Sequence, residues 1–369
     1  MPTPEPRIQL VAQQSDLEIA ATALAERSEI PLDTEFARTD TFRARLCLLQ
    51  VGAADDVYCV DMLAPLDASR LWNSIAAPGA LKILHAAKQD LEVFFQRFGS
   101  VPSPLFDTQI AAGLLGHPPQ AGYAALVEAE LGVTLDKSQT RTDWARRPLT
   151  AAQIEYAGND VVHLPQLAAQ LRERLHQAGR SEWAAEDCAA LLDPTLYEIK
   201  PDLAWERLGG IEFQTPVVQA RARRLAAWRE VKADRSDRPR QWILSDEALQ
   251  RLAGAGPADA AAIEALDILP AATIRNSGAA LLAELRQGET DHDSGTVTVL
   301  QKERPAPTDN ARVKQLGTVV QRVATELGVA AEVLATRSDL AGLLRGEREL
   351  RSLRGWRRAV IGEALLAAL

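Results

Sequence analysis

Cysteine is scarce in this chain, and long apolar runs are missing from it. The 369 residues contain three cysteines, Cys47, Cys59 and Cys188, and no CxxC pair, so neither a disulfide framework nor a zinc site is expected. No apolar stretch approaches the roughly 20 residues that a membrane helix needs. The first residues also lack the basic-then-apolar layout of a signal peptide. We therefore expect a cytoplasmic protein without a membrane partner.

The chain also lacks a positive net charge. Its charge of -9 and its pI of about 5.3 do not favour nucleic-acid binding, because phosphates are contacted chiefly by Lys and Arg. The charge is uneven, however, since residues 221–240 hold eight basic side chains and three acidic ones. That local excess can attract a polyanion, or it is simply a solvated helix face.

A phosphate-binding GxxxxGK[ST] loop is absent from the sequence. This absence excludes a helicase, and no nucleotide cofactor is expected. The length and the apolar content of 47% instead favour two or three folded domains.

The first part of the chain alternates strand-like and helical runs. Strands are predicted at 28–33, 45–51, 57–61 and 81–85. The first three are close enough for antiparallel hairpins, whereas the last is reached through an amphipathic helix. A mixed sheet with helices is therefore expected.

Beyond residues 193–216, which we interpret as a connection, the strand signal disappears. Helices are predicted over 217–289 and 310–369, with a polar linker that begins at Gln287. The two helical blocks share a faint layout, which indicates either a tandem duplication or a coincidence. The predicted domains are 1–195, 213–292 and 305–369.

Five side chains in the first part of the chain are candidate catalytic residues. Asp33 and Glu35 are two apart at the end of a predicted strand and so share a face, while Tyr156 and Asp160 are four apart on a predicted helix and share another. Asp90 lies in the first turn of a helix that is predicted to end at Gly99. Carboxylates are the ligands that Mg2+ prefers, and two such ions can clamp both oxygens of a phosphoryl displacement. These residues predict a metal-dependent nuclease.

Each of these signals also has an ordinary explanation. A DxE pair at a strand end is usually a solvated turn, and an aspartate at a helix start is usually a cap. The case therefore rests on the joint order of the motifs.

That order resembles a known family. DTEF, HAAKQDLEVF and YAGND are similar to the three exonuclease motifs of the DEDD superfamily, in the subgroup with tyrosine in the third motif. FDTQIAAGLLG and LDKSQTRTDWARRPLTAAQIEYAGNDV resemble ribonuclease D, and LAAWREVKADRSDRPRQWILSDEALQRLA resembles an HRDC domain. The resemblance implies a ribonuclease H-like mixed-sheet 3'-5' exonuclease domain followed by two small helical HRDC-type domains, an α/β plus all-α architecture.

The resemblance also implies a mechanism. Asp33, Glu35 and Asp160 would bind one divalent cation, Mg2+ or Mn2+, and Asp33 would hold a second with Asp90, which acts partly through water. Tyr156 would orient or help deprotonate the attacking water. The expected reaction trims the 3' ends of tRNA precursors and other small structured RNAs and releases 5'-mononucleotides. Separately from the resemblance, we expect a monomer.

Several other residues are candidates for RNA contacts or for supporting roles. Candidate RNA contacts are Lys137, Gln139, Arg141 and Trp144 before the third motif, and Arg235, Arg238 and Arg240 in the basic cluster. The alternative for the first group is a charged loop with one buried tryptophan. His85 and Asp107 match family positions, but a hydrogen-bonding role for His85 and a capping role for Asp107 are open alternatives.

Two other functions remain open. The proofreading domains of DNA polymerases share these motifs, so a 3'-5' DNA exonuclease is one alternative. A nucleic-acid-binding scaffold with a vestigial site is another. The sequence keeps all four carboxylates, which favours an active enzyme.

Overall fold

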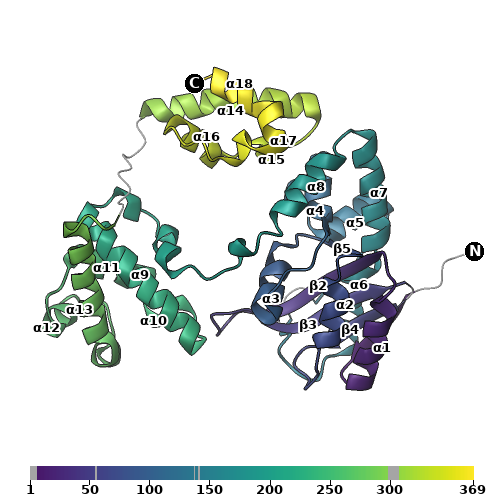
Figure 1. Cartoon of the computed structure of the whole chain (residues 1–369), viewed down its shortest axis with the longest axis horizontal. Coiled ribbons are helices and arrows are strands. Elements are labelled where there is room, and N and C mark those ends of the chain that lie inside the picture. Colours follow the sequence, from purple (N-terminus) through teal and green to yellow (C-terminus); the bar gives the residue numbers. More distant parts are fainter. Residues whose placement is uncertain (1–5, 55, 137, 140–141, 298–306) are drawn as a thin grey trace, which may run out of the picture. The chain divides into compact units, whose positions relative to one another are not determined.

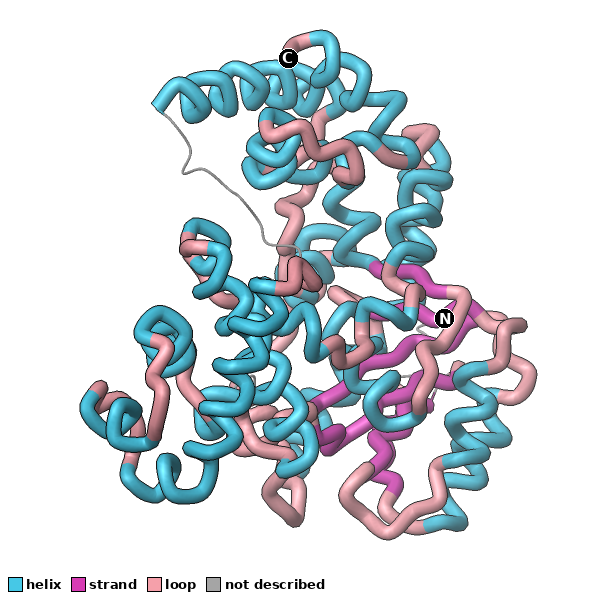
Figure 2. The backbone as a smooth tube through the Cα atoms, turned by 60° about the vertical axis from the view of Figure 1, so that its left-hand side comes forward, coloured by secondary structure: helices cyan, strands magenta, loops and turns pink. Residues whose placement is uncertain are grey.

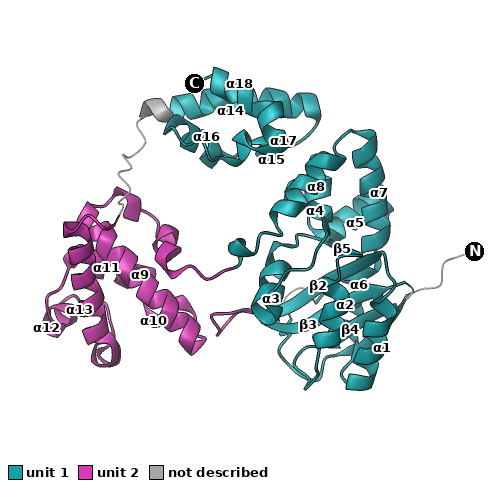
Figure 3. Ribbon diagram, in the orientation of Figure 1, with its two compact units in different colours: residues 1–37, 45–197, 306–369 teal, residues 38–44, 198–305 magenta. Residues whose placement is uncertain are grey.

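The computed structural model describes residues 6–54, 56–136, 138–139, 142–297 and 307–369. Its contacts divide the chain into two compact units (Figure 3). Unit 1 comprises Met1–Ala37, Arg45–Tyr197 and Ala306–Leu369, and unit 2 comprises Arg38–Ala44 and Glu198–Pro305. The last helical block thus belongs with the α/β part of the chain. The three domain boundaries expected from the sequence stay predictions.

Unit 1 is built on a six-stranded sheet in the order β1-β4-β3-β2-β5-β6 (Figure 1). The strands are Arg7–Val11 (β1), Glu29–Ala37 (β2), Arg45–Ala53 (β3), Asp56–Asp61 (β4), Leu81–Leu84 (β5) and Leu105–Asp107 (β6). β2, β3 and β4 are antiparallel neighbours. β1, β5 and β6 each pair in parallel. The mixed sheet is therefore confirmed.

Two details of the strand prediction were wrong. β2 does not end at residue 33 but runs to Ala37, so Asp33 and Glu35 lie inside it, just before an irregularity between Glu35 and Phe36. β1 and β6 were not predicted at all. β1 does alternate polar and apolar residues over Arg7–Leu10, but it has only five residues and is an edge strand in which Leu10 is 39% exposed.

Helices cover both faces of the sheet, as Figure 2 shows for the magenta strands and cyan helices. One face packs against α1 (Gln14–Leu24), α2 (Ser69–Ala76) and α3 (Lys88–Phe98). The other packs against α6 (Ala151–Val162) and α7 (Leu164–Gln177). The same unit contains α4 (Thr108–Leu114), α5 (Tyr123–Leu131), α8 (Ser181–Ala190) and the short helix η1 (Pro194–Leu196).

Three local predictions for these helices are confirmed. α3 ends at Gly99, which has a left-handed φ of 75°. α6 begins with the capping box of Thr150 and Gln153. The helical stretch is interrupted before Pro165, where α7 begins as a separate helix.

The last helical block shares its apolar core with α7 and α8 of the α/β part. Its elements are α14 (Pro307–Leu327), α15 (Ala331–Leu334), α16 (Arg337–Leu344), η4 (Arg351–Leu353), α17 (Gly355–Arg357), η5 (Arg358–Gly362) and α18 (Glu363–Ala367). Among the described helices, none is long and apolar enough to cross a membrane.

Unit 2 is mainly helical. Its elements are η2 (Pro201–Arg207), η3 (Ile211–Phe213), α9 (Pro216–Ser236), α10 (Arg240–Ile243), α11 (Asp246–Ala255), α12 (Ala260–Ala265) and α13 (Ala271–Asp293). A linker beginning at Gln287 was predicted wrongly, because α13 continues to Asp293. Glu289 and Asp291 of that segment pair with Arg221 and Arg224 of α9.

Candidate active site

Three of the predicted carboxylates converge on one face of the sheet. Ligand oxygens of Asp33, Glu35 and Asp160 all lie within 4.8 Å of one another. Asp33 and Glu35 project from the same side of β2 because side chains alternate along a strand. Helix α6 packs over β2, β3 and β4 and brings Asp160 to them. Tyr156, one turn earlier on α6, hydrogen-bonds the Asp160 carboxylate.

The close approach of α6 to the sheet depends on Gly158, which lies between Tyr156 and Asp160. A Cβ atom at this position would lie 2.5 Å from Cδ1 of Ile8 on β1. The glycine in YAGND therefore lets the helix that carries two site residues lie against the sheet.

Asp90 reaches the site from the other side of β2. It is 6% exposed, and its carboxylate accepts a hydrogen bond from the Thr34 hydroxyl. Thr34 lies between Asp33 and Glu35 and so faces the side of the sheet on which α3 packs. Asp90 is outside the converging group of three, but its charge acts on both Asp33 and Glu35.

The surroundings of the four carboxylates disfavour their charged forms. Burial raises the pKa of Asp33 well above its usual range, and the neighbouring carboxylates raise it further. Burial, followed by the charges of Asp160 and Asp90, raises the pKa of Glu35 to about 8. Burial raises the pKa of Asp90 and of Asp160 to about 7, although hydrogen bonds from Thr34 and Tyr156 act in the opposite direction.

This arrangement fits divalent cations. Buried carboxylates that repel each other are expected to ionise together at neutral pH only when positive charge lies between them. The donor set consists of carboxylate oxygens, which hard cations such as Mg2+ and Mn2+ prefer.

Residues near the carboxylates include one that the sequence did not indicate. Tyr123 of α5 is half-buried, and the charges of Asp160 and Asp33 add to desolvation in raising the pKa of its phenol. His85 is held by hydrogen bonds to Thr108 Oγ1 and to the Ala121 carbonyl oxygen, both 2.9 Å long, which favours its hydrogen-bonding alternative.

Asp107 joins two turns of the backbone. It caps α4 by accepting hydrogen bonds from the amides of Gln109 and Ile110. It also accepts hydrogen bonds from the amides of Ala86 and Ala87, which precede α3. The capping role expected as an alternative is confirmed.

The predicted RNA contacts before α6 are only partly described, because Lys137 and Arg141 lie outside the described residues. Gln139 is half-buried. Trp144 is 5% exposed and packs in the core with its ring centroid 6.2 Å from that of Tyr156, which favours the alternative of a buried tryptophan.

The basic cluster of α9 is largely engaged within unit 2. Arg221, Arg224 and Arg229 pair with Glu289, Asp291 and Asp246. Arg240 pairs with the buried Glu230 and lies over the ring of Phe42. Of the three predicted contacts in this cluster, Arg235 and Arg238 are exposed.

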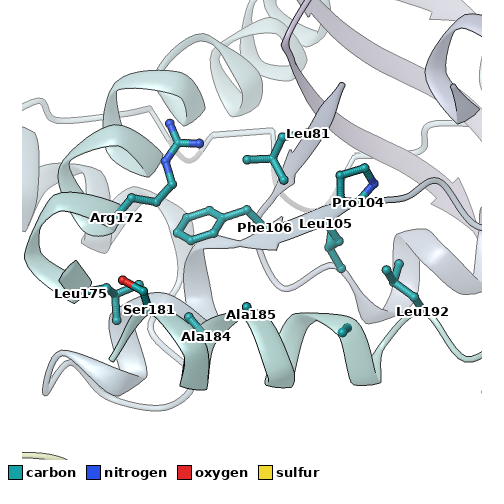
Figure 4. A pocket seen from close by; sticks show the side chains of 11 residues that line it. Leu81, Pro104, Leu105, Phe106, Arg172, Leu175, Ser181, Ala184, Ala185 and Leu192 are labelled. Atoms are coloured by element: carbon teal, nitrogen blue, oxygen red, sulfur yellow. The ribbon is translucent and has the colours of Figure 1, made fainter. Parts of the chain in front are cut away.

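A pocket of about 390 Å³ lies elsewhere in unit 1, between β5, β6, α7 and α8 (Figure 4). Its lining is apolar apart from Ser181 and Arg172, whose guanidinium lies 5.7 Å from the centroid of the Phe106 ring. Arg172 already pairs with Glu29. The pocket offers no acid, base or metal ligand comparable to the carboxylate group.

Comparison with known proteins agrees with this geometry. Residues 8–176 match a family model described as 3'-5' exonuclease, and residues 218–285 match the HRDC domain. The chain is 38% identical to ribonuclease D of Granulibacter bethesdensis, in a match that covers 97% of this chain and 91% of the relative. It is 36% identical to ribonuclease D of Pseudomonas paraeruginosa, over 99% of this chain and 98% of the relative.

Solved structures lead to the same fold. The crystal structure of Escherichia coli RNase D, described as an exoribonuclease involved in structured RNA processing, superposes with a TM-score of 0.90 at 31% identity and covers 98% of each chain. The catalytic core of RRP6 from Trypanosoma brucei has a TM-score of 0.60 at 22% identity, covers 78% of this chain and 83% of that one, and shares the fold alone.

Proposed function

Because this chain belongs to the ribonuclease D family and is a 3'-5' exoribonuclease, we propose that it trims the 3' ends of tRNA precursors and other small structured RNAs with two divalent cations. The observation that carries the proposal is the convergence of Asp33, Glu35 and Asp160 beside Asp90. The identity of the cations as Mg2+ or Mn2+ belongs to the proposal, as do a monomeric state and a cytoplasmic location.

In this proposal each cation is bound by a different set of carboxylates. Asp33, Glu35 and Asp160 would hold one, while Asp33 and Asp90 would hold the other, Asp90 partly through water. When bound, the two cations make water a stronger acid and offset the charge that develops on the phosphate.

Tyr156 takes part in positioning the water. Its phenol donates a hydrogen bond to Asp160, and a phenol oxygen that donates its proton can also accept a hydrogen bond, here from the attacking water. Such a water would attack the terminal phosphodiester in line with the leaving 3' oxygen, and a 5'-mononucleotide would be released.

The proposed RNA contacts are Lys137, Gln139, Arg141 and Trp144, which precede α6 in the sequence, and Arg235, Arg238 and Arg240 in unit 2. The exposure of Arg235 and Arg238 supports a phosphate-binding role for these two, because solvated arginines meet RNA phosphates without first breaking an internal ion pair. Trp144 and Arg240 would have to leave their present partners.

The test is a time course on a 3'-extended tRNA precursor labelled at its 5' end, with Mg2+ or chelator. Wild type should give a metal-dependent ladder that shortens from the 3' end, and Asp33→Ala should give none. Glu128→Gln, which alters an exposed carboxylate of α5, serves as the matched control and should behave as wild type. Cleavage of DNA but not RNA would favour the DNA exonuclease, and RNA binding without cleavage would favour the scaffold.

A further inference from the structure

Among the residues that the structure describes, one buried side chain beside the carboxylates has no hydrogen-bond partner. Gln50 is in the middle of β3 and is 0% exposed. Neither its Oε1 nor its Nε2 meets a partner among the described residues. Buried amides are nearly always hydrogen-bonded, because desolvation without a new hydrogen bond is unfavourable. An unpaired amide in the centre of a sheet therefore requires an explanation.

The strand register places Gln50 next to a metal-site residue. It lies directly opposite Asp33 on β2 and opposite Cys59 on β4. Residues opposite each other in antiparallel strands project from the same face, with Cβ atoms roughly 4.5–5.5 Å apart. An extended glutamine side chain can span that separation.

The face in question is the one covered by α6. Cys59 belongs to the core on the α6 side, and its Sγ lies 3.8 Å from the Ile154 carbonyl oxygen. Besides burial, the charges of Asp33 and Asp160 raise the pKa of this thiol. Gln50 lies between Cys59 and Asp33, so its amide is within the same negative field.

On the basis of the proposed function, we propose that Gln50 is a positioning residue of the metal site, whose side-chain amide donates a hydrogen bond to the Asp33 carboxylate when cations are bound. Asp33 is the ligand that both cations would share. A carboxylate oxygen retains a second lone pair beside the one that faces a cation, and an N–H donor there fixes the plane of the carboxylate. The missing partner of Gln50 is thus supplied by the loaded site.

The first test compares Gln50→Met with wild type by calorimetric titration of Mn2+ into the full-length chain. Met has a similar length and lacks the donor. Loss of a hydrogen bond to a metal ligand typically lowers metal affinity about 10- to 100-fold. We expect that loss, together with a melting temperature in chelator that equals or exceeds that of wild type, because the variant no longer buries an unpaired amide. If Gln50 had only a structural role, Gln50→Met would leave the Mn2+ affinity unchanged and would lower the melting temperature in chelator.

Leu48→Met is the matched control. Leu48 is also 0% exposed and lies opposite Glu35 as Gln50 lies opposite Asp33, so it tests repacking on the same face. Its Mn2+ affinity should stay within twofold of wild type. RNA cleavage by Gln50→Met should recover at high Mn2+ concentration, because the variant binds Mn2+ more weakly but still forms the loaded site once the cation is in excess.

A second measurement does not depend on the variant. In a crystal structure of wild type with Mn2+, Gln50 Nε2 should lie about 2.8–3.2 Å from an Asp33 carboxylate oxygen. A separation beyond hydrogen-bond range, or an unchanged Mn2+ affinity of Gln50→Met, overturns the inference and leaves the proposed function standing. Wild type that neither binds Mn2+ nor cleaves RNA overturns both.

Discussion

Asp160 is a residue whose folded environment disfavours its own charge. Burial raises the pKa of this carboxyl to about 7 from 3.8, despite the hydrogen bond from Tyr156. In the absence of cations, the folded chain therefore holds a proton on Asp160 that the unfolded chain has lost between roughly pH 4 and pH 7. The contribution of Asp160 to the free energy of unfolding therefore increases as the pH falls from about 7 to about 4. Above about pH 7 the group makes no such contribution.

Asp160→Asn should consequently stabilise the chain in chelator, on the order of 2 kcal/mol at pH 8. The advantage over wild type should shrink as the pH is lowered from 7 to 4, because wild type becomes protonated there. Thermal unfolding in chelator at pH 5 and pH 8 measures both effects.

Glu128→Gln is the control and should change little at either pH. With saturating Mg2+ the order should reverse, since cation binding stabilises the wild-type folded state. An Asn variant that is less stable than wild type at pH 8 in chelator would contradict this account of the site.

The site residues differ in how far the sequence could reveal them. Asp33 with Glu35 and Tyr156 with Asp160 are predictable from spacing, because a strand or helix alone places each pair on one face. Thr34 and Gln50 are not, since their roles depend on which residues of α3 and β2 come to lie opposite them. That register is set by the packing of the whole sheet.

The turn between β5 and α3 is held by one side chain, that of Asp107, and this turn positions helix α3. Ala86 in this turn has a left-handed φ of 56°, which is unfavourable for a residue with a Cβ. The buried carboxylate of Asp107 holds the turn through the amides of Ala86 and Ala87, at 3.1 and 2.8 Å. Asp90 lies in the first turn of the helix that follows.

Asp107→Ala should therefore destabilise the chain by about 2–4 kcal/mol, because buried amides lose their acceptor. The kcat for RNA cleavage should fall as well, since Asp90 is no longer fixed. Urea unfolding and steady-state kinetics measure the two effects. Asp67→Ala, which removes an exposed hydrogen bond to the amide of Ser69, should destabilise the chain much less and leave kcat unchanged; an equal loss in both variants would argue against the role of Asp107.

Helix α13 illustrates why one element was misjudged. Glu289 and Asp291 lie in an acidic, glycine-containing stretch typical of a linker, yet they pair with arginines of α9. At Gly288, a Cβ atom would lie 2.8 Å from Cα of Arg221, so glycine allows α13 to approach α9 closely at this point. The basic face of α9 and the acidic end of α13 were each interpreted alone, and only their pairing explains both.

At the scale of the molecule, the last helical block is joined to α8 by a buried ion pair. Arg357 and Asp187 form two hydrogen bonds of 2.6 and 2.7 Å, and their side chains are 5% and 18% exposed. The adjacent Trp356 stacks on Trp183 with ring centroids 4.3 Å apart. The two parts thus share polar as well as apolar contacts.

Arg357→Leu should weaken this junction by roughly 2–3 kcal/mol, because it leaves the half-buried Asp187 carboxylate without its cationic partner and with the hydrogen bond from Trp356 Nε1. The double variant Asp187→Leu with Arg357→Leu should recover much of the loss, since no buried charge remains. Thermal unfolding and the rate of proteolysis within residues 307–369 measure the effect.

The neighbouring arginine provides the matched control. Arg358 pairs with Glu363, but these side chains are 64% and 65% exposed, so Arg358→Leu should cost less than about 1 kcal/mol. If both arginine variants changed stability equally, the Arg357–Asp187 ion pair would add no more stability than an exposed pair. The junction would then be held by its apolar contacts. A large loss for Arg357→Leu alone, recovered in the double variant, would instead show that the desolvated Asp187 charge determines how firmly the last block is held.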